Sequence, residues 1–276
     1  MHLRRMLNSQ HDVIVITPNS QWNWIPSNIW VGTGRMDKSR VLFPLAPLYK
    51  KKGIFYHQAK VVAFYPEGTA DDPTPLVEME YTSPERAGQT ERIGYDYLIN
   101  ATGPKLNFDA TPGLGPDGGN SLSVCTAAHA DQTSKELARI IEAARSGKEQ
   151  RLVIGTGHGT CTCQGAAFEY AFNVEFELRE AGVRDKCEVV YVTNEFELGD
   201  FGVGGMRFKQ NGFMTTSQLW TESLFRERGV KAISGAAVKR VDEGVLTYET
   251  LDGHEHQLDF DFAMLLPDYG DRKSVV

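Results

Sequence analysis

The stretch RLVIGTGHGTCTCQGAAFEY, residues 151–170, decides the fold. It opens with an apolar run typical of a buried strand, passes through a glycine-rich turn and continues as a helix that ends at Gly182. The next strand follows in KCEVVYV, residues 186–192. A strand, a helix and a second strand in this order predict an α/β fold with a parallel sheet.

The turn in this stretch has several possible uses. The glycines of GTGHGT, residues 155–160, would let the backbone approach the pyrophosphate of a dinucleotide. The helix N-terminus would also lower the pKa of a thiol on Cys161 or Cys163 and make it a nucleophile. A metal could bind these cysteines with His158 and His129, but C-x-C is not the usual zinc spacing and no C-x₂-C is present, so no metal site is predicted. Packing of two small residues in a tight turn is the remaining alternative.

Composition limits the class of protein. The chain has 276 residues, is 41% hydrophobic and carries a net charge of −7. The acidic balance argues against nucleic-acid binding and provides no basic arm for anionic lipid. No apolar run reaches the ~18 residues of a membrane span, and the start lacks the features of a secretory signal. Its 4 cysteines are too few for a disulfide framework and suit a reducing compartment, with Cys187 expected as a buried apolar residue.

The flanking sequence extends the α/β pattern. Residues 12–17 form a β-branched run that predicts a strand, and residues 53–68 and 75–83 alternate as a hairpin does. Residues 93–105 resemble a strand that runs into a glycine turn, and a helix is expected from His129 to a stop at Gly147. Several short strands should follow between residues 231 and 270.

Five segments together resemble the sulfide:quinone oxidoreductases, flavoproteins of the pyridine nucleotide-disulfide reductase superfamily. The segments are TPNSQWNWIPSNIWVGTG (17–34), YDYLINATGPK (95–105), SLSVCTAAHA (121–130), GTCTCQGAAFEYAFNVEFELREAGVRDK (159–186) and ELGDFGVGGM (197–206). The resemblance implies two Rossmann-like, FAD/NAD(P)-binding domains, the first of them incomplete at its N-terminus. The expected divisions are a partial FAD-binding domain at 1–130, a second domain carrying the cysteine turn at 131–267 and a tail at 268–276.

In this family sulfide attacks a redox-active cysteine pair, and the electrons pass through FAD to a membrane quinone. The VCTA segment matches Cys125, and distance from the following helix matches Cys163, which leaves Cys161 as an extra thiol. The resemblance further implies sulfide and quinone as partners, a homo-oligomer, and a peripheral inner-membrane or cytoplasmic location. It also implies FAD contacts at a strand end facing the adenosine ribose (Thr17 and Asn19), beside the ring system (Pro26, Ser27 and Asn28) and at the ATG turn (Ala101, Thr102 and Gly103).

Parts of the family pattern have no counterpart in this sequence. The first strand with its G-x-G-x-x-G turn, a third cysteine, the quinone pocket and the C-terminal membrane anchor are not found, so a piece of such an enzyme is expected. Two other hypotheses stay open. One is a related flavoprotein, either a sulfide-oxidising flavocytochrome subunit or a type II NADH:quinone reductase in which Glu195 would hold the NADH ribose. The other is a gene remnant without activity.

Overall fold

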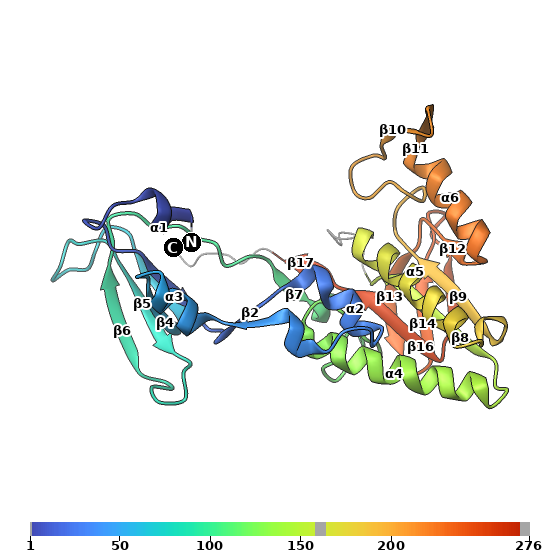
Figure 1. Ribbon diagram of the computed structural model, residues 1–276, viewed down its shortest axis with the longest axis horizontal. Coiled ribbons are helices and arrows are strands. Elements are labelled where there is room, and N and C mark those ends of the chain that lie inside the picture. The colour runs from blue at the N-terminus through green and yellow to red at the C-terminus, as the bar shows by residue number, and fades with distance from the viewer. Residues whose placement is uncertain (1, 158–163, 271–276) are drawn as a thin grey trace. The chain divides into compact units, whose positions relative to one another are not determined.

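The computed structural model describes residues 2–157 and 164–270. Contacts between Cα atoms divide the chain into two units, each made from more than one piece of sequence (Figure 1). The first contains residues 2–23 and 42–104, and the second contains residues 24–41 and 105–270. The predicted domains are contiguous pieces whose boundary at residue 130 lies inside a helix, and that division stays a prediction.

The first unit is built on a four-stranded sheet in the order β1-β4-β5-β6. Strand β1 runs parallel to β4, and β4, β5 and β6 are antiparallel to one another. A small core of Ala59, Met79 and Tyr81 packs on one face with Ile16 and Ile93. The elements of this unit are α1 (His2–Met6), β1 (Ile14–Thr17), β2 (Gln21–Asn23), β3 (Leu42–Pro44), α3 (Leu45–Lys51), β4 (Phe55–Tyr65), β5 (Leu76–Tyr81) and β6 (Thr90–Gly94).

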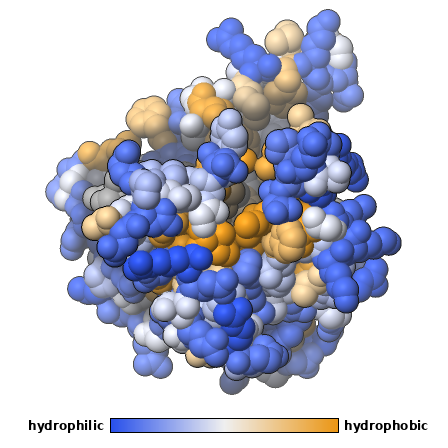
Figure 2. Space-filling view, turned by 90° about the vertical axis from the view of Figure 1, so that its left-hand side faces the viewer, coloured by the Kyte–Doolittle hydropathy of each residue, from blue (hydrophilic) through white to orange (hydrophobic). Residues whose placement is uncertain are grey.

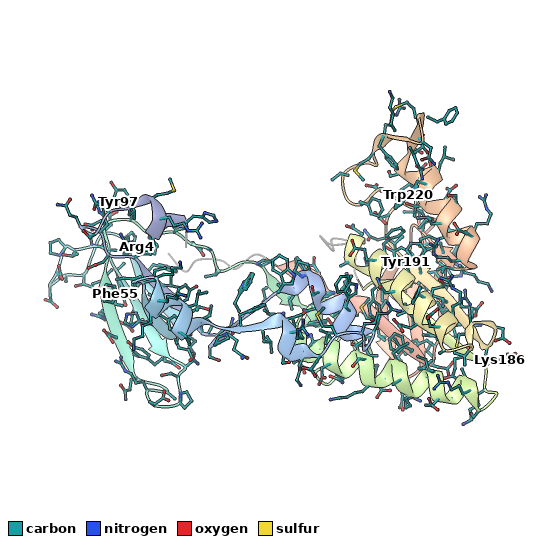
Figure 3. The ribbon with its side chains drawn as sticks, viewed as in Figure 1. Arg4, Phe55, Tyr97, Lys186, Tyr191 and Trp220 are labelled. Carbon is teal, nitrogen blue, oxygen red and sulfur yellow. The ribbon has the colours of Figure 1, made fainter. Side chains whose placement is uncertain are left out.

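The structure confirms the predicted strand at residues 12–17 and the β4–β5 hairpin. The predicted strand in residues 93–105 is wrong, because β6 ends at Gly94 and residues 95–104 belong to no strand. Tyr97, Leu98 and Ile99 are exposed there, and Tyr97 projects from the chain with 94% of its surface accessible (Figure 3). An apolar run becomes a strand only when a neighbouring strand offers it hydrogen bonds, and no strand of the described residues pairs with this one.

The second unit contains the parallel sheet that the sequence predicts, in the order β12-β9-β8-β16. Its strands β8 (Gln150–Thr156) and β9 (Cys187–Val192) are buried almost throughout, as expected for strands covered on both faces. Helix α5 (Gln164–Glu180) connects them, and α6 (Ser217–Arg228) connects β9 to β12 (Lys231–Ile233). Strand β16 (Phe262–Leu266) completes the sheet beside β8.

Helix α4 (Ala127–Arg145) precedes β8 and has clear start and stop signals. The hydroxyl of Thr126 accepts the His129 backbone N–H at 3.1 Å and caps the first turn. The positions at helical spacing, Leu137, Ile140 and Ala144, are buried. Gly147 follows with a left-handed φ of 92°, as the sequence predicts for the end of this helix.

The remaining elements of the second unit complete its core and its surface. A three-stranded antiparallel sheet, β13-β14-β15, packs Val238, Val241 and Leu246 against the parallel sheet. The other elements are η1 (Ile25–Ser27), α2 (Asn28–Gly32), η2 (Lys38–Val41), β7 (Lys105–Asn107), η3 (Phe108–Ala110), η4 (Arg184–Lys186), β10 (Arg207–Gln210), β11 (Phe213–Thr216), β13 (Ala237–Asp242), β14 (Val245–Glu249), β15 (Glu255–Asp259) and β17 (Asp268–Gly270).

Candidate redox site

Two cysteine-bearing segments leave the same edge of the parallel sheet. Leu122 pairs in parallel with Met264 of β16, and the chain then continues to Cys125. Strand β8 lies on the other side of β16 and leads through Gly157 into the cysteine turn. Because both segments run in the direction of β16, they emerge at the carboxyl ends of the strands, where ligand sites of α/β proteins usually lie.

The Cys125 segment is fixed by hydrogen bonds on both sides. The Ser123 hydroxyl accepts the Cys125 backbone N–H at 3.1 Å, and the Ser123 carbonyl accepts the buried Thr133 hydroxyl at 2.7 Å. Cys125 is half-buried and directly precedes Thr126, the N-cap of α4. The partial positive charge of a helix N-terminus favours a thiolate at such a position.

Residues 24–41 pack beside the segment that carries Cys125. Asn28 is buried, and its Nδ2 donates to the Val124 carbonyl at 3.1 Å. Tyr170 of α5 donates its hydroxyl hydrogen to the Gly32 carbonyl at 3.0 Å, and complete burial raises the pKa of that phenol. The PSN segment, the VCTA segment and the helix after the cysteine turn therefore meet in one place, although they are far apart in the sequence.

Cys161 and Cys163 lie outside the described residues, as does His158, but the residues on both sides of their turn are well anchored. The Gly157 N–H donates to the Leu266 carbonyl at 2.7 Å, and the Gly157 carbonyl accepts the Thr111 hydroxyl at 2.9 Å. At the other end, Gln164 is buried and its carbonyl accepts the Tyr191 hydroxyl at 3.4 Å. The two ends of the turn are thus held by β16 and β9.

His129 lies in the first turn of α4, four residues after Cys125. The sequence alone did not indicate what surrounds its ring. Its ring packs edge-on against Phe108, with 5.8 Å between ring centroids, and its Nδ1 is buried without a hydrogen-bond partner among the described residues. Burial lowers the pKa of His129, opposed by the Asp117 carboxylate, which lies 3.6 Å from Nε2. The imidazole is therefore neutral at pH 7 and above.

The predicted flavin contacts are distributed over both units. In the first unit, Thr17 ends β1 and Asn19 is exposed beyond it, while Ala101, Thr102 and Gly103 lie in the exposed stretch after β6. In the second unit, Pro26 and Ser27 lie in η1, where Pro26 is exposed and Ser27 is half-buried, whereas Asn28 is buried and bonded to Val124. The amide of Asn28 has a structural bond of its own, which the sequence alone did not indicate.

Glu195, the candidate ribose ligand of the NADH hypothesis, is engaged within its own loop. It is buried, and its carboxylate accepts the Phe201 backbone N–H and the Thr193 hydroxyl, the latter at 3.1 Å. Burial raises the pKa of Glu195, opposed mainly by the Phe201 bond. A carboxylate held in this way stabilises the loop and does not present its oxygens to a ribose.

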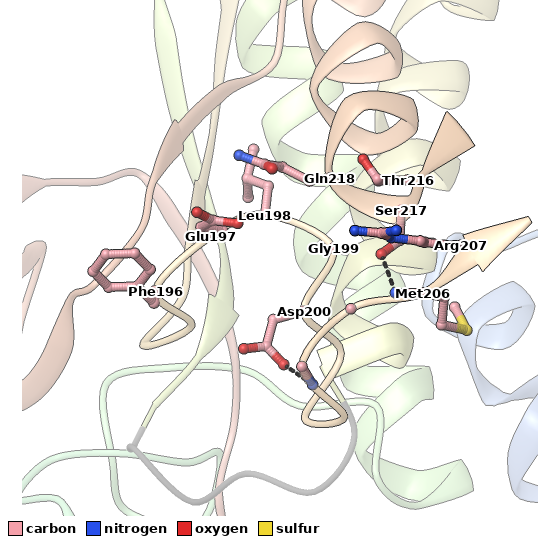
Figure 4. A pocket seen from close by; sticks show the side chains of 12 residues that line it. Phe196, Glu197, Leu198, Gly199, Asp200, Met206, Arg207, Thr216, Ser217 and Gln218 are labelled. Atoms are coloured by element: carbon pink, nitrogen blue, oxygen red, sulfur yellow. Dashed lines mark hydrogen bonds between the residues drawn. The ribbon is translucent and has the colours of Figure 1, made fainter. Parts of the chain in front are cut away.

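The loop after Glu195 encloses a hollow of about 350 Å³. Figure 4 shows Asp200 and Gly204 joined by a hydrogen bond on one side and Ser217 and Met206 on the other. Gly199 has a φ of 82°, and a Cβ there would lie 2.6 Å from the Ser217 carbonyl oxygen, so a side chain cannot be accommodated. The loop is thus folded tightly against the start of α6.

Cys187 behaves as the sequence predicts. It is buried at the start of β9, and burial raises the pKa of its thiol to about 11. A thiol that stays protonated at neutral pH is a poor nucleophile.

Among the described residues, no helix is both long and apolar enough to cross a membrane.

Comparison with known proteins identifies relatives of the whole chain. No protein-family model matches. A sulfide-quinone reductase of Aquifex aeolicus (strain VF5) is 32% identical over 257 residues, which are 93% of this chain and 52% of the relative. The crystal structure of the sulfide:quinone oxidoreductase from Aquifex aeolicus superposes with a TM-score of 0.80 at 30% identity, over 99% of this chain and 56% of that one.

A more distant solved structure shares the fold. NDH2 from Plasmodium falciparum in complex with NADH has a TM-score of 0.72 at 15% identity and covers 99% of this chain and 54% of its own. The chain thus has the mixed α/β fold, with Rossmann-like parallel sheets, of the FAD- and NAD(P)-binding oxidoreductases. It spans about half the length of the relatives it matches. In sequence and in fold, the chain is similar to about half of the sulfide-quinone reductase of Aquifex aeolicus.

Proposed function

We propose that this chain carries the thiol centre of a flavin-dependent enzyme that oxidises sulfide and delivers the electrons to quinone. The observation that carries the proposal is that the Cys125 segment and the end of β8, which leads into the cysteine turn, leave one edge of a parallel sheet, in a chain 32% identical to a sulfide-quinone reductase. Cys125 and Cys163 are the proposed redox pair, and Cys161 is the additional thiol.

The two cysteines would perform the first sulfur chemistry. Hydrosulfide attacks one sulfur of the oxidised pair, a sulfur–sulfur bond to hydrosulfide forms, and the bond between the cysteines breaks. The products are a cysteine persulfide and a cysteine thiolate, so the sulfide is oxidised by two electrons and the pair is reduced. The helix N-terminus beside Cys125 would stabilise the thiolate.

FAD is the proposed acceptor, and two polar side chains of the first unit would suit one end of it. At the carboxyl end of β1, parallel to β4, Thr17 and Asn19 offer a hydroxyl and an amide suited to a ribose. Ala101, Thr102 and Gly103 would pass close to the cofactor, and Pro26 and Ser27 would lie beside its ring system. When bound, FAD supplies two-electron acceptance between thiols and quinone.

The partners follow from this proposal. Sulfide and a lipophilic quinone are the substrates, which implies a peripheral position at an inner membrane or a cytoplasmic enzyme that reaches it. A homo-oligomer is the proposed assembly.

Anaerobic spectroscopy tests the proposal. The chain is mixed with FAD, desalted and titrated with sulfide while the flavin absorption band is followed. We expect the band to bleach in the parent and in the Cys161→Ser and Cys187→Ala variants, and to persist in Cys125→Ser and Cys163→Ser. Bleaching in a Cys125→Ser, Cys163→Ser double variant would contradict the thiol pair, and a colourless parent would contradict flavin binding by this chain.

A further inference from the structure

The connection from β9 to α6 is the most unusual surface element of the second unit. Connections between a strand and a helix in α/β units usually have about 2–6 residues. This one runs from residue 193 to 216 and contains a hairpin of its own, β10–β11, which projects beyond the start of α6 (Figure 1).

The hairpin has a defined shape. Its turn residues Asn211 and Gly212 both have left-handed φ values, 50° and 87°, which is the geometry of a type I′ two-residue turn. Phe208 packs edge-on against Trp220 of α6, with 6.1 Å between ring centroids, and fixes the hairpin to the helix. Figure 3 labels Trp220 on that helix.

Apolar side chains are exposed at the end of this element. Phe213 is 78% exposed and Met214 is 64% exposed, directly after the turn. At the base of the hairpin, Met206 and Leu219 are also exposed. Exposing a phenylalanine and a methionine to water on a fixed turn is unfavourable in free energy, and exposed apolar groups of this kind often mark a binding surface.

Positive charge accompanies the apolar side chains. Arg207 and Lys209 are exposed, and Lys209 is the cross-strand neighbour of Met214. Among the described residues neither cation forms an ion pair. No Asp or Glu occurs between residues 201 and 221, although the chain as a whole carries a net charge of −7. Glu197 and Asp200 line the hollow at the base with Arg207, and Asp200 accepts its own loop's Gly204 N–H.

We propose that the β10–β11 hairpin docks on an anionic lipid surface. Phe213 and Met214 enter the boundary between headgroups and acyl chains, and Arg207 and Lys209 meet the lipid phosphates. The size of the apolar tip favours lipid over a second copy of the chain. A buried aromatic side chain contributes about 150–250 Å², whereas a stable protein interface needs roughly 1,000 Å² or more.

This docking would orient the redox site. The hairpin follows β9, so it leaves the sheet at the same edge as the cysteine turn after β8 and the Cys125 segment beside β16. The proposal does not depend on the sulfide chemistry, since vesicle binding needs neither FAD nor a reactive thiol.

Flotation with vesicles tests it. The purified chain is mixed with vesicles of phosphatidylcholine alone or with one-third phosphatidylglycerol. We expect binding to the anionic vesicles, a loss of roughly tenfold or more in Phe213→Ser, Met214→Ser, and a loss of about fivefold for each of Arg207→Gln and Lys209→Gln. The matched control is Leu251→Ser, because Leu251 is 71% exposed in the turn between β14 and β15 of the same unit.

A second measurement follows the tip itself. In Phe213→Trp, quenching of the added fluorescence by brominated lipids should exceed that of the parent protein. Equal flotation of all variants, or flotation lost equally in Leu251→Ser, would overturn the proposal. So would a parent that does not bind vesicles but forms a dimer that Phe213→Ser, Met214→Ser dissociates, since the tip would then be a contact between copies.

Discussion

Single residues around Cys125 define the environment in which a thiol would react. Asn28 holds the Val124 carbonyl, Ser123 holds the Cys125 N–H, and Thr126 caps the helix that follows. None of these side chains takes part in the proposed sulfur chemistry, yet each fixes backbone next to Cys125. A cysteine presented by rigid backbone loses little conformational entropy when it reacts.

His129 gives a pH dependence at this scale. Because its pKa is lowered in the folded state, the unfolded chain binds the proton more readily, and folding stability falls as the pH drops through the ordinary histidine range near about 6.5. We expect the free energy of unfolding to decrease between about pH 7.5 and pH 5.5, and the decrease to be smaller in His129→Gln. Urea unfolding at several pH values measures both, and equal pH slopes in the two proteins would contradict this role.

At the scale of elements, α2 packs closely on α4 and α5 because Gly32 has no side chain. A Cβ at this position would lie 2.8 Å from Val124 Cγ1 and 3.0 Å from Tyr170 Cε2. Both neighbours are buried, so neither can move away easily.

Gly32→Ala should therefore destabilise the second unit by about 1–3 kcal/mol. The matched control is Gly165→Ala in α5, where a Cβ would meet no atom within 4 Å and helix propensity should add about 0.5–1 kcal/mol of stability. Chemical denaturation compares the two variants. If Gly32→Ala were as stable as the parent, the packing of α2 against Val124 would be looser than described.

The sequence predicted those elements whose signals are local. The β8–α5–β9 unit, the end of α4 near Gly147 and the β4–β5 hairpin follow from period, caps and turns. The run at Tyr97–Ile99 misled because strand formation depends on a partner elsewhere. Burial of Asn28 could not be predicted from the sequence either, because its hydrogen bond to Val124 joins residues 96 apart. The Asn211–Gly212 dipeptide is a hairpin signal of the local kind, since both residues readily adopt the left-handed φ of a type I′ turn.

At the scale of the whole molecule, the chain passes from the first unit to the second and back before it enters the second unit again. Residues 24–41 belong by their contacts to the second unit, although the first unit supplies the sequence on both sides of them. Figure 2 shows a face of the molecule on which hydrophobic side chains lie among hydrophilic ones. In the first unit, Ile14, Phe55 and Ile99 are among the exposed large apolar residues.

A nick in the exposed stretch at residues 96–104 tests this arrangement. We expect the two fragments to remain together in native size-exclusion chromatography, because residues 24–41 of the first fragment are packed in the second unit. Introducing Gly32→Ala should make the fragments separate more readily, whereas Gly165→Ala should not. Fragments that separate at once without any substitution would contradict the assignment of residues 24–41.

The hydrogen bond between Tyr170 and Gly32 can form only after both residues have been synthesised. It joins residues 138 apart, so Gly32 leaves the ribosome long before its partner exists. At about 5–20 residues per second, the delay is roughly 7–28 s. During that interval the nascent segment from residue 24 to 41 lacks its packing partners, and Val31 and Val41, which are buried in the folded protein, stay exposed to water, so this segment offers an apolar site to a chaperone.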